Sequence, residues 1–171
     1  ALEAALDAPT DAPSCPSAGR ISSTPTTVEA SADSEPAYAG TGPTAPDALF
    51  SALETACHAL MAAEPELTEM DRLVGDGDIG HSLAAGAKAV ADALPALRGK
   101  PVDAVLHQIG LRLRRSVGGT SGPLYAAFAI AAAQELRDGA ADAAAFAGAF
   151  RAGTEAIVRL GGASAGDRTM V

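Results

Sequence analysis

From Pro46 onward, apolar residues recur at intervals of three and four, which is the spacing of an α-helix with one buried face. No run shows the period of two that is typical of a half-buried strand. We therefore expect an all-α domain. The expected helices run over about 47–63, from Leu83 to about Leu94, from Val102 to about Val117, from just after residues 118–123 to about Arg137, and through Phe146, Phe150, Ile157 and Leu160.

Composition supports helices and excludes several classes of protein. Apolar residues make up 48% of the chain but aromatic residues only 4%, so alanine supplies much of the apolar content and favours closely packed helices. The net charge of −9 argues against a nucleic-acid partner. No apolar run approaches the roughly 20 residues of a membrane span. Cys15 and Cys57 match no metal-binding spacing and favour a reducing cytoplasm.

Residues 1–46 differ from the rest of the chain. They are rich in Pro, Ser, Thr, Ala and Gly, and such a composition buries too little apolar surface to offset its ordering entropy. We expect an interdomain linker over 1–46 and a helical domain over 47–171.

The loop GDGDIG, residues 75–80, matches the dinucleotide-binding pattern G-x-G-x-x-G, but its surroundings do not. That pattern follows a buried strand, whereas the preceding residues, EPELTEMDRLV, are acidic and polar. Asp76 and Asp78 would also repel a phosphate that approached directly. A Walker pattern, G-x-x-x-x-G-K-[ST], is absent from the sequence. Neither common phosphate loop explains this segment.

Three aspartates in and before this loop, Asp71, Asp76 and Asp78, follow the pattern D-x4-D-x-D. Carboxylates are the hard oxygen ligands that Mg²⁺ prefers, and Mg²⁺ usually keeps positions for water and phosphate. An EF-hand is excluded because Ala87 stands where its bidentate Glu belongs. The alternative is a solvated acidic turn in which Asp78 caps the next helix.

Two further glycine-bearing joints separate the expected helices. GGTSGP, residues 118–123, directly precedes a helix, where backbone N–H groups and the helix dipole can bind an anion. It could equally be a plain turn with Thr120 or Ser121 as the N-cap. GGASAGDRTM, residues 161–170, reads by itself as a surface loop.

Taken together, the three joints resemble the nucleotide-binding domain of the dihydroxyacetone kinase family over roughly residues 47–171. The segment LDAPTDAP near the start also resembles the seam that follows the substrate-binding domain in fused, single-chain members, which implies that residues 1–46 include the tail end of such a domain. The resemblance implies an antiparallel barrel of amphipathic helices with ATP bound at one rim. Such a barrel would be incomplete here, because the family continues through further helices beyond Val171, and we expect this chain to be inactive alone.

The resemblance also implies a set of site residues. Asp71, Asp76 and Asp78 would hold two Mg²⁺ ions that bridge the ATP phosphates. At position 81 the side chain could donate to a phosphate or merely fill space. The residues expected along the nucleotide are Asp78, Ile79, Gly80, His81, Gly119, Thr120, Ser121, Gly161, Thr169 and Met170.

The substrate implied by the resemblance is dihydroxyacetone or a related short ketose, held on a histidine of a separate substrate-binding domain. Two other activities stay open: an ADP-binding subunit that a phosphoryl-carrier protein serves, and a nucleotide-sensing module without catalysis. The resemblance is also compatible with a homodimer of the full-length protein. No nucleic-acid or membrane partner is expected.

Overall fold

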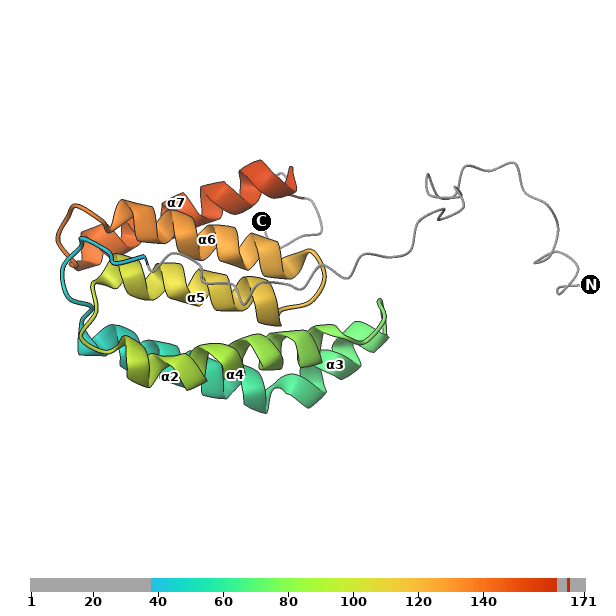
Figure 1. Ribbon diagram of the computed structural model, residues 1–171. Coiled ribbons are helices and arrows are strands. Elements are labelled where there is room, and N and C mark those ends of the chain that lie inside the picture. Colours follow the sequence, from blue (N-terminus) through green and yellow to red (C-terminus); the bar gives the residue numbers. More distant parts are fainter. Residues whose placement is uncertain (1–37, 163–165, 167–171) are drawn as a thin grey trace, which may run out of the picture. The chain divides into compact units, whose positions relative to one another are not determined.

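The computed structural model describes residues 38–162 and residue 166. In this part of the chain the secondary structure is helical apart from an isolated bridge between Thr44 and Pro101, which confirms the all-α fold. With the labels of Figure 1, the helices are α2 (Asp47–Ala62), α3 (Glu64–Arg72), α4 (Ile79–Leu97), α5 (Val102–Ser116), α6 (Ser121–Glu135) and α7 (Ala143–Gly161).

The helices form two layers (Figure 1). Helices α5, α6 and α7 lie in one layer, and α2, α3 and α4 lie in the other. Contacts join α2 to α4, α4 to α5, α5 to α6 and α6 to α7, so neighbours along this series pack side by side. The α3–α4 loop, the α5–α6 loop and the end of α7 all lie at the same end of the molecule, on the right in Figure 1. The first two glycine-bearing joints and the described start of the third therefore share one end.

Small residues make the close helix packing possible. On α6 the buried residues include Ala126, Ala129, Ala132 and Ala133, each at most 5% exposed. Larger side chains such as Leu94 and Leu136 fill the core. Alanine has no side-chain entropy to lose, which favours the helix, and its small side chain lets a neighbouring helix approach closely.

Helix α7 forms where the apolar period predicted a helix, but two of the residues used for that prediction do not lie in the core. Phe150 and Leu160 are each 67% exposed. Its buried face is made instead by smaller residues, Ala149, Gly153 and Ala156, together with Ile157. The period was therefore right about the helix and wrong about which side chains it buries.

Helix α3 was not expected, because its sequence has no apolar face. None of its residues is buried. Its ends supply the signals: Pro65 lies in the first turn beside the acidic Glu64, and Arg72 lies in the last turn. These charges suit the helix dipole and the proline suits the first turn, so the helix forms without a hydrophobic stripe.

The described part of the segment expected to be a linker, residues 38–46, lies against the start of α5. The Val102 amide donates to the Pro43 carbonyl at 2.8 Å, and the Ala45 amide donates to the Lys100 carbonyl at 3.0 Å. Ala45 is buried. These residues therefore pack on the helical domain, ahead of the expected boundary at residue 47.

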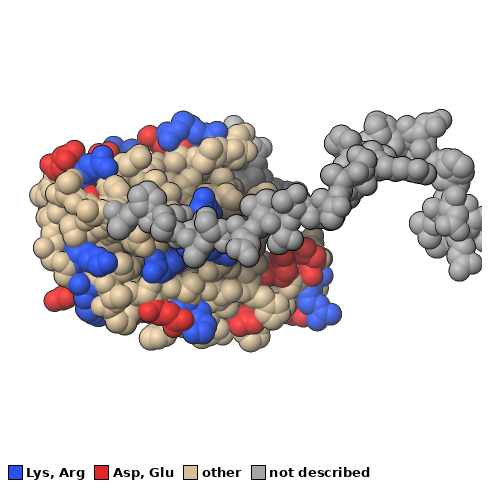
Figure 2. Space-filling model, in the orientation of Figure 1, with Lys and Arg blue, Asp and Glu red and all other residues tan. Residues whose placement is uncertain are grey.

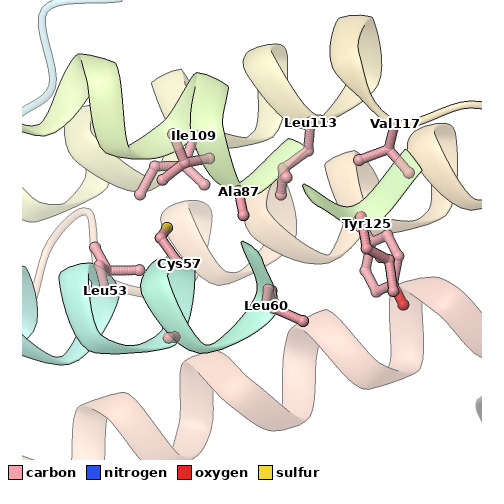
Figure 3. A pocket seen from close by; sticks show the side chains of 11 residues that line it. Leu53, Cys57, Leu60, Ala87, Ile109, Leu113, Val117 and Tyr125 are labelled. Carbon is pink, nitrogen blue, oxygen red and sulfur yellow. The ribbon is translucent and has the colours of Figure 1, made fainter. Parts of the chain in front are cut away.

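Between the layers lies an apolar cavity of about 260 Å³ (Figure 3). Its walls include Leu53 and Cys57 of α2, Ala87 of α4 and Ile109 of α5. Burial raises the pKa of the Cys57 thiol, in keeping with these apolar surroundings. Such a lining offers no partner for a charged phosphate. Within the described residues, no helix combines the length and apolar character needed to cross a membrane.

Candidate functional site

The loop between α3 and α4 is organised by Asp71, the second-last residue of α3. Its Oδ2 accepts hydrogen bonds from the amides of Asp78 at 2.9 Å and Ile79 at 3.3 Å. Asp78 occupies the N-cap position of α4, but its side chain makes no capping bond. The start of α4 is thus capped by an aspartate of the preceding helix. The alternative in which Asp78 caps α4 does not describe this turn.

The three aspartates of the loop converge. Asp71, Asp76 and Asp78 each offer a carboxylate oxygen, and these oxygens lie within 4.8 Å of one another. Asp71 is half-buried, whereas the other two are exposed. Figure 2 shows acidic side chains gathered at this end of the molecule. The charges that the sequence placed close together are also close in space.

Two glycines allow this tight turn. Gly77 has a φ of +78°, a left-handed conformation that other residues rarely adopt. At Gly75, a Cβ would lie only 2.6 Å from Oδ1 of Asp71. Bulkier residues at these two positions would displace the carboxylates.

The clustering has an electrostatic cost. The charge of Asp76 is the largest influence that raises the pKa of Asp78, followed by desolvation, a hydrogen bond that the protonated Asp78 carboxyl donates to Asp76, and the charge of Asp71. Like charges at this separation disfavour the ionised form. A divalent cation would remove the repulsion. Ligands on opposite sides of Mg²⁺ lie about 4 Å apart, so the observed spacing needs little adjustment to fit such an ion.

The second glycine-bearing joint, residues 118–123, lies against the first turn of α4. At Gly118, a Cβ would lie 2.9 Å from Oγ of Ser82, and Gly119 adopts a φ of +63°. Thr120 is the N-cap residue of α6 but forms no side-chain capping bond. The Thr120 hydroxyl therefore does not cap the first amides of α6. An anion site at the start of a helix uses such uncapped amides.

The end of α7, where the third joint begins, meets the second joint (residues 118–123) around a cavity of about 470 Å³. Leu160 and Gly161 contribute from the end of α7, and Thr120, Pro123 and Leu124 from the start of α6. Gly162 ends α7 in a left-handed conformation, and its amide donates to the Val158 carbonyl. Thr169 and Met170 lie outside the described residues. The structure thus brings together the parts of all three joints that it describes.

Two side chains that were not singled out in the sequence also belong to this region. Glu64, at the start of α3, places Oε1 2.5 Å from Nδ1 of His81. Ser82 touches the second joint. Pro65 and the acidic first turn could have revealed α3. No local pattern could have paired residues 64 and 81, which are 17 positions apart.

A family model described as the DAK2 domain matches residues 73–171, which is more than half of the chain. The chain belongs to the DAK2 domain family. The match begins after α3 and covers the loop from Gly75 to Gly80 and the two later joints.

The relatives of this DAK2 domain chain agree with the predicted resemblance. Human triokinase/FMN cyclase is 34% identical over 173 residues, covering 97% of this chain and 30% of the human protein. The ADP-binding subunit DhaL of the PEP-dependent dihydroxyacetone kinase of Escherichia coli (strain K12) is 37% identical over 119 residues, covering 68% of this chain and 56% of the subunit. The predicted relationship to dihydroxyacetone kinases is confirmed.

A solved structure also resembles this DAK2 domain chain. The dihydroxyacetone kinase of C. freundii in complex with AMP-PNP and Mg²⁺ aligns with a TM-score of 0.66 and 32% sequence identity. The alignment covers 86% of this chain and 26% of the C. freundii chain. The chain thus spans less than a third of the human and C. freundii proteins, and little more than half of DhaL.

Proposed function

We propose that this DAK2 domain is the nucleotide-binding part of a kinase that transfers the γ-phosphoryl group of ATP to a hydroxyl of dihydroxyacetone or a related short ketose. The convergence of Asp71, Asp76 and Asp78 beside the joint that opens α6 carries the proposal. The names of the relatives support the substrate class, and the C. freundii complex supports a nucleotide with Mg²⁺. The two isolated cysteines favour a reducing compartment, and we also propose that the protein is cytoplasmic.

The three carboxylates would hold two Mg²⁺ ions. Bound there, the metal would neutralise the triphosphate charge and orient the γ-phosphoryl group, which are the main requirements of phosphoryl transfer. Asp71 suits this role because only its Oδ2 caps α4, which leaves Oδ1 on the side of the loop glycines. The acidic loop would thus approach the phosphates through metal.

The nucleotide would lie along the shared end of the helices. The start of α6 would hold phosphate oxygens with backbone amides and hydroxyls, and the cavity between α6 and α7 would take the rest of the nucleotide. At the start of α4 the amides of Asp78 and Ile79 already donate to Asp71, so the phosphates would face the backbone of Gly80 and His81 there. The proposed contacts are Asp78, Ile79, Gly80, His81, Gly119, Thr120, Ser121, Gly161, Thr169 and Met170.

The acceptor hydroxyl would come from a separate substrate-binding domain. None of the three histidines is proposed to hold the ketose. His58 is exposed on α2, His81 is paired with Glu64, and His107 stacks on Tyr38 with ring centroids 4.4 Å apart. On this proposal residues 1–46 join the substrate-binding domain to the helical domain over 47–171, and the full-length protein can form a homodimer.

A second candidate function is that of an ADP-binding subunit which a phosphoryl-carrier protein serves. The relationship to E. coli DhaL favours it, because that relative is named as an ADP-binding subunit of a PEP-dependent enzyme. The two candidates differ in the donor. ATP supports turnover with a ketose in the first, whereas only the phosphorylated carrier supports it in the second. A nucleotide-sensing module would bind MgADP and show neither turnover.

Isothermal titration calorimetry of MgATP against the wild-type chain and Asp76→Asn tests the proposal. We expect the substitution to lower Mg²⁺-dependent nucleotide affinity sharply while circular dichroism shows unchanged helicity, because Asp76 is exposed and lies outside the helices. Asp92→Asn is the matched control, since Asp92 is an exposed acid farther along α4. Equal MgATP affinity in wild type and Asp76→Asn would contradict the metal assignment.

A further inference from the structure

Helices α3 and α4 are in close contact at Gly80, in the first turn of α4. A Cβ at Gly80 would overlap Oγ1 of Thr68 and the backbone carbonyl oxygen of Glu64. Gly80 is buried, so the first turn of α4 rests directly on the backbone of α3. The relative position of the two helices is therefore set within one turn of Asp78.

One residue farther along α4, a side-chain bridge spans the same contact. Nδ1 of His81 lies 2.5 Å from Oε1 of Glu64, which joins the first turn of α4 to the first turn of α3. Neither residue is one of the three clustered aspartates. The bridge is therefore made by side chains outside the cluster.

The clustered carboxylates act in the opposite sense. Asp71 belongs to α3, and Asp78 stands at the start of α4, so their mutual repulsion favours separation of the two helices. A metal site works best when its ligands are already at the binding distance, because no energy is then spent on gathering them. The hydrogen bonds from the amides of Asp78 and Ile79 to Asp71 already hold the two helices together against this repulsion, and a contact outside the ligands can add to them.

We propose that Glu64 and His81 are a positioning pair that holds α3 and α4 together, so that Asp71 and Asp78 are preorganised for divalent cations. This inference rests on the proposed Mg²⁺ site. The imidazole of His81 acts on that site through Glu64, while the backbone at position 81 stays free to face the phosphates. Glu64 thus becomes part of the site although it touches no ligand.

Binding of Mn²⁺ to the full chain without nucleotide, followed by electron paramagnetic resonance, tests the pair. His81→Ala and Glu64→Ala should each weaken Mn²⁺ binding on the order of tenfold, the lower end of the effect of residues that orient metal ligands. The double variant should bind no more weakly than the weaker single variant, because both substitutions break the same contact. His81→Gln, whose amide can donate to Glu64, should restore most of the affinity.

Lys88→Ala is the matched control. Lys88 and Asp92 form an exposed ion pair on the same helix, so its loss should leave Mn²⁺ affinity unchanged. If the pair only stabilised the fold, the two alanine variants would melt at a lower temperature in the absence of metal but would bind Mn²⁺ with the wild-type affinity. That result, or additive losses in the double variant, would overturn the positioning role. If the wild-type chain itself bound no Mn²⁺, the proposed metal site would fail instead.

Discussion

The hydroxyl of Tyr38 donates a hydrogen bond of 3.0 Å to Oδ2 of Asp103, across 65 positions of sequence. The amides of Thr41 and Gly42 donate to the same carboxylate at 3.0 and 3.1 Å. Asp103 lies on the first turn of α5 and is 0% exposed. At Gly40, a Cβ would lie 2.7 Å from Oδ1 of Asp103, so glycine is needed there. One buried carboxylate therefore anchors the segment that leads into the helical domain.

We expect Asp103→Asn to lower the free energy of unfolding by about 2–3 kcal/mol. The Asn side chain keeps one acceptor oxygen, but its NH₂ group replaces the other oxygen and places a donor against backbone N–H groups. Tyr38→Phe removes the hydroxyl, which donates to Asp103 and accepts from Nε of Arg137, and should cost about 1–2 kcal/mol. Urea denaturation measures both values. An Asp103→Asn variant as stable as wild type would show that the anchor does not contribute to stability.

The anchor should also make stability depend on pH. Burial raises the pKa of Asp103, but hydrogen bonds from the Thr41 amide, the Tyr38 hydroxyl and the Gly42 amide outweigh it and hold the pKa below its usual range. A carboxylate of this kind contributes stability that is complete above its unfolded pKa of about 4 and is lost as the pH falls through the lower folded value. The stability difference between wild type and Asp103→Asn should therefore be largest at neutral pH and shrink below about pH 4. Urea denaturation across this range checks the trend, and a constant difference would contradict it.

Asp76→Asn should have opposite effects with and without metal. The charge of Asp76 raises the pKa of Asp78, so at neutral pH the ionised pair destabilises the metal-free fold, and this cost disappears as the pH falls through the raised pKa. Removing Asp76 should raise the melting temperature in EDTA, and Mg²⁺ should then stabilise the variant less than wild type. Differential scanning calorimetry with EDTA and with Mg²⁺ measures both. Asp92→Asn should change neither, and a lower melting temperature for Asp76→Asn in EDTA would refute the repulsion.

Gly80→Ala should destabilise the protein by about 1–3 kcal/mol, because the new methyl group would overlap Thr68 and the backbone of Glu64. Gly148→Ala is the control. Its Cβ would meet its nearest neighbour, Oε1 of Glu135, at an ordinary 3.5 Å, and it lies inside α7. That substitution should stabilise by about 0.5–1 kcal/mol. Equal effects at positions 80 and 148 in thermal denaturation would show that α3 does not press on α4.

How much of the fold was predictable follows from how each helix is stabilised. Helices α2, α4 and α5 bury apolar residues at regular intervals, so the sequence alone places them to within a few residues. Helix α3 buries none of its residues and was missed, since its stability depends on its ends and on contact with α4. On α7 the period located the helix, but Phe150 stays largely exposed and meets the ring of Phe128 on α6 edge-on, while the small Gly153 faces that ring.

For the candidate site, the sequence supplied the residue types and the structure supplied the distances. The pattern D-x4-D-x-D identified the three aspartates, and the glycines identified the turn. That Asp71 caps α4 could not be read from spacing, because it depends on the angle at which α3 meets α4. The roles of Thr169 and Met170 stay predictions, since both lie outside the described residues.

By itself, the sequence determined the helical class, the acidic loop and the family to which this chain belongs, because each depends on residues that are near one another along the chain. Only the tertiary structure decided that Ser82 meets Gly118, that Glu64 meets His81 and that Tyr38 meets Asp103. Such pairs form when helices pack, and packing depends on the fit of whole surfaces that no local pattern encodes.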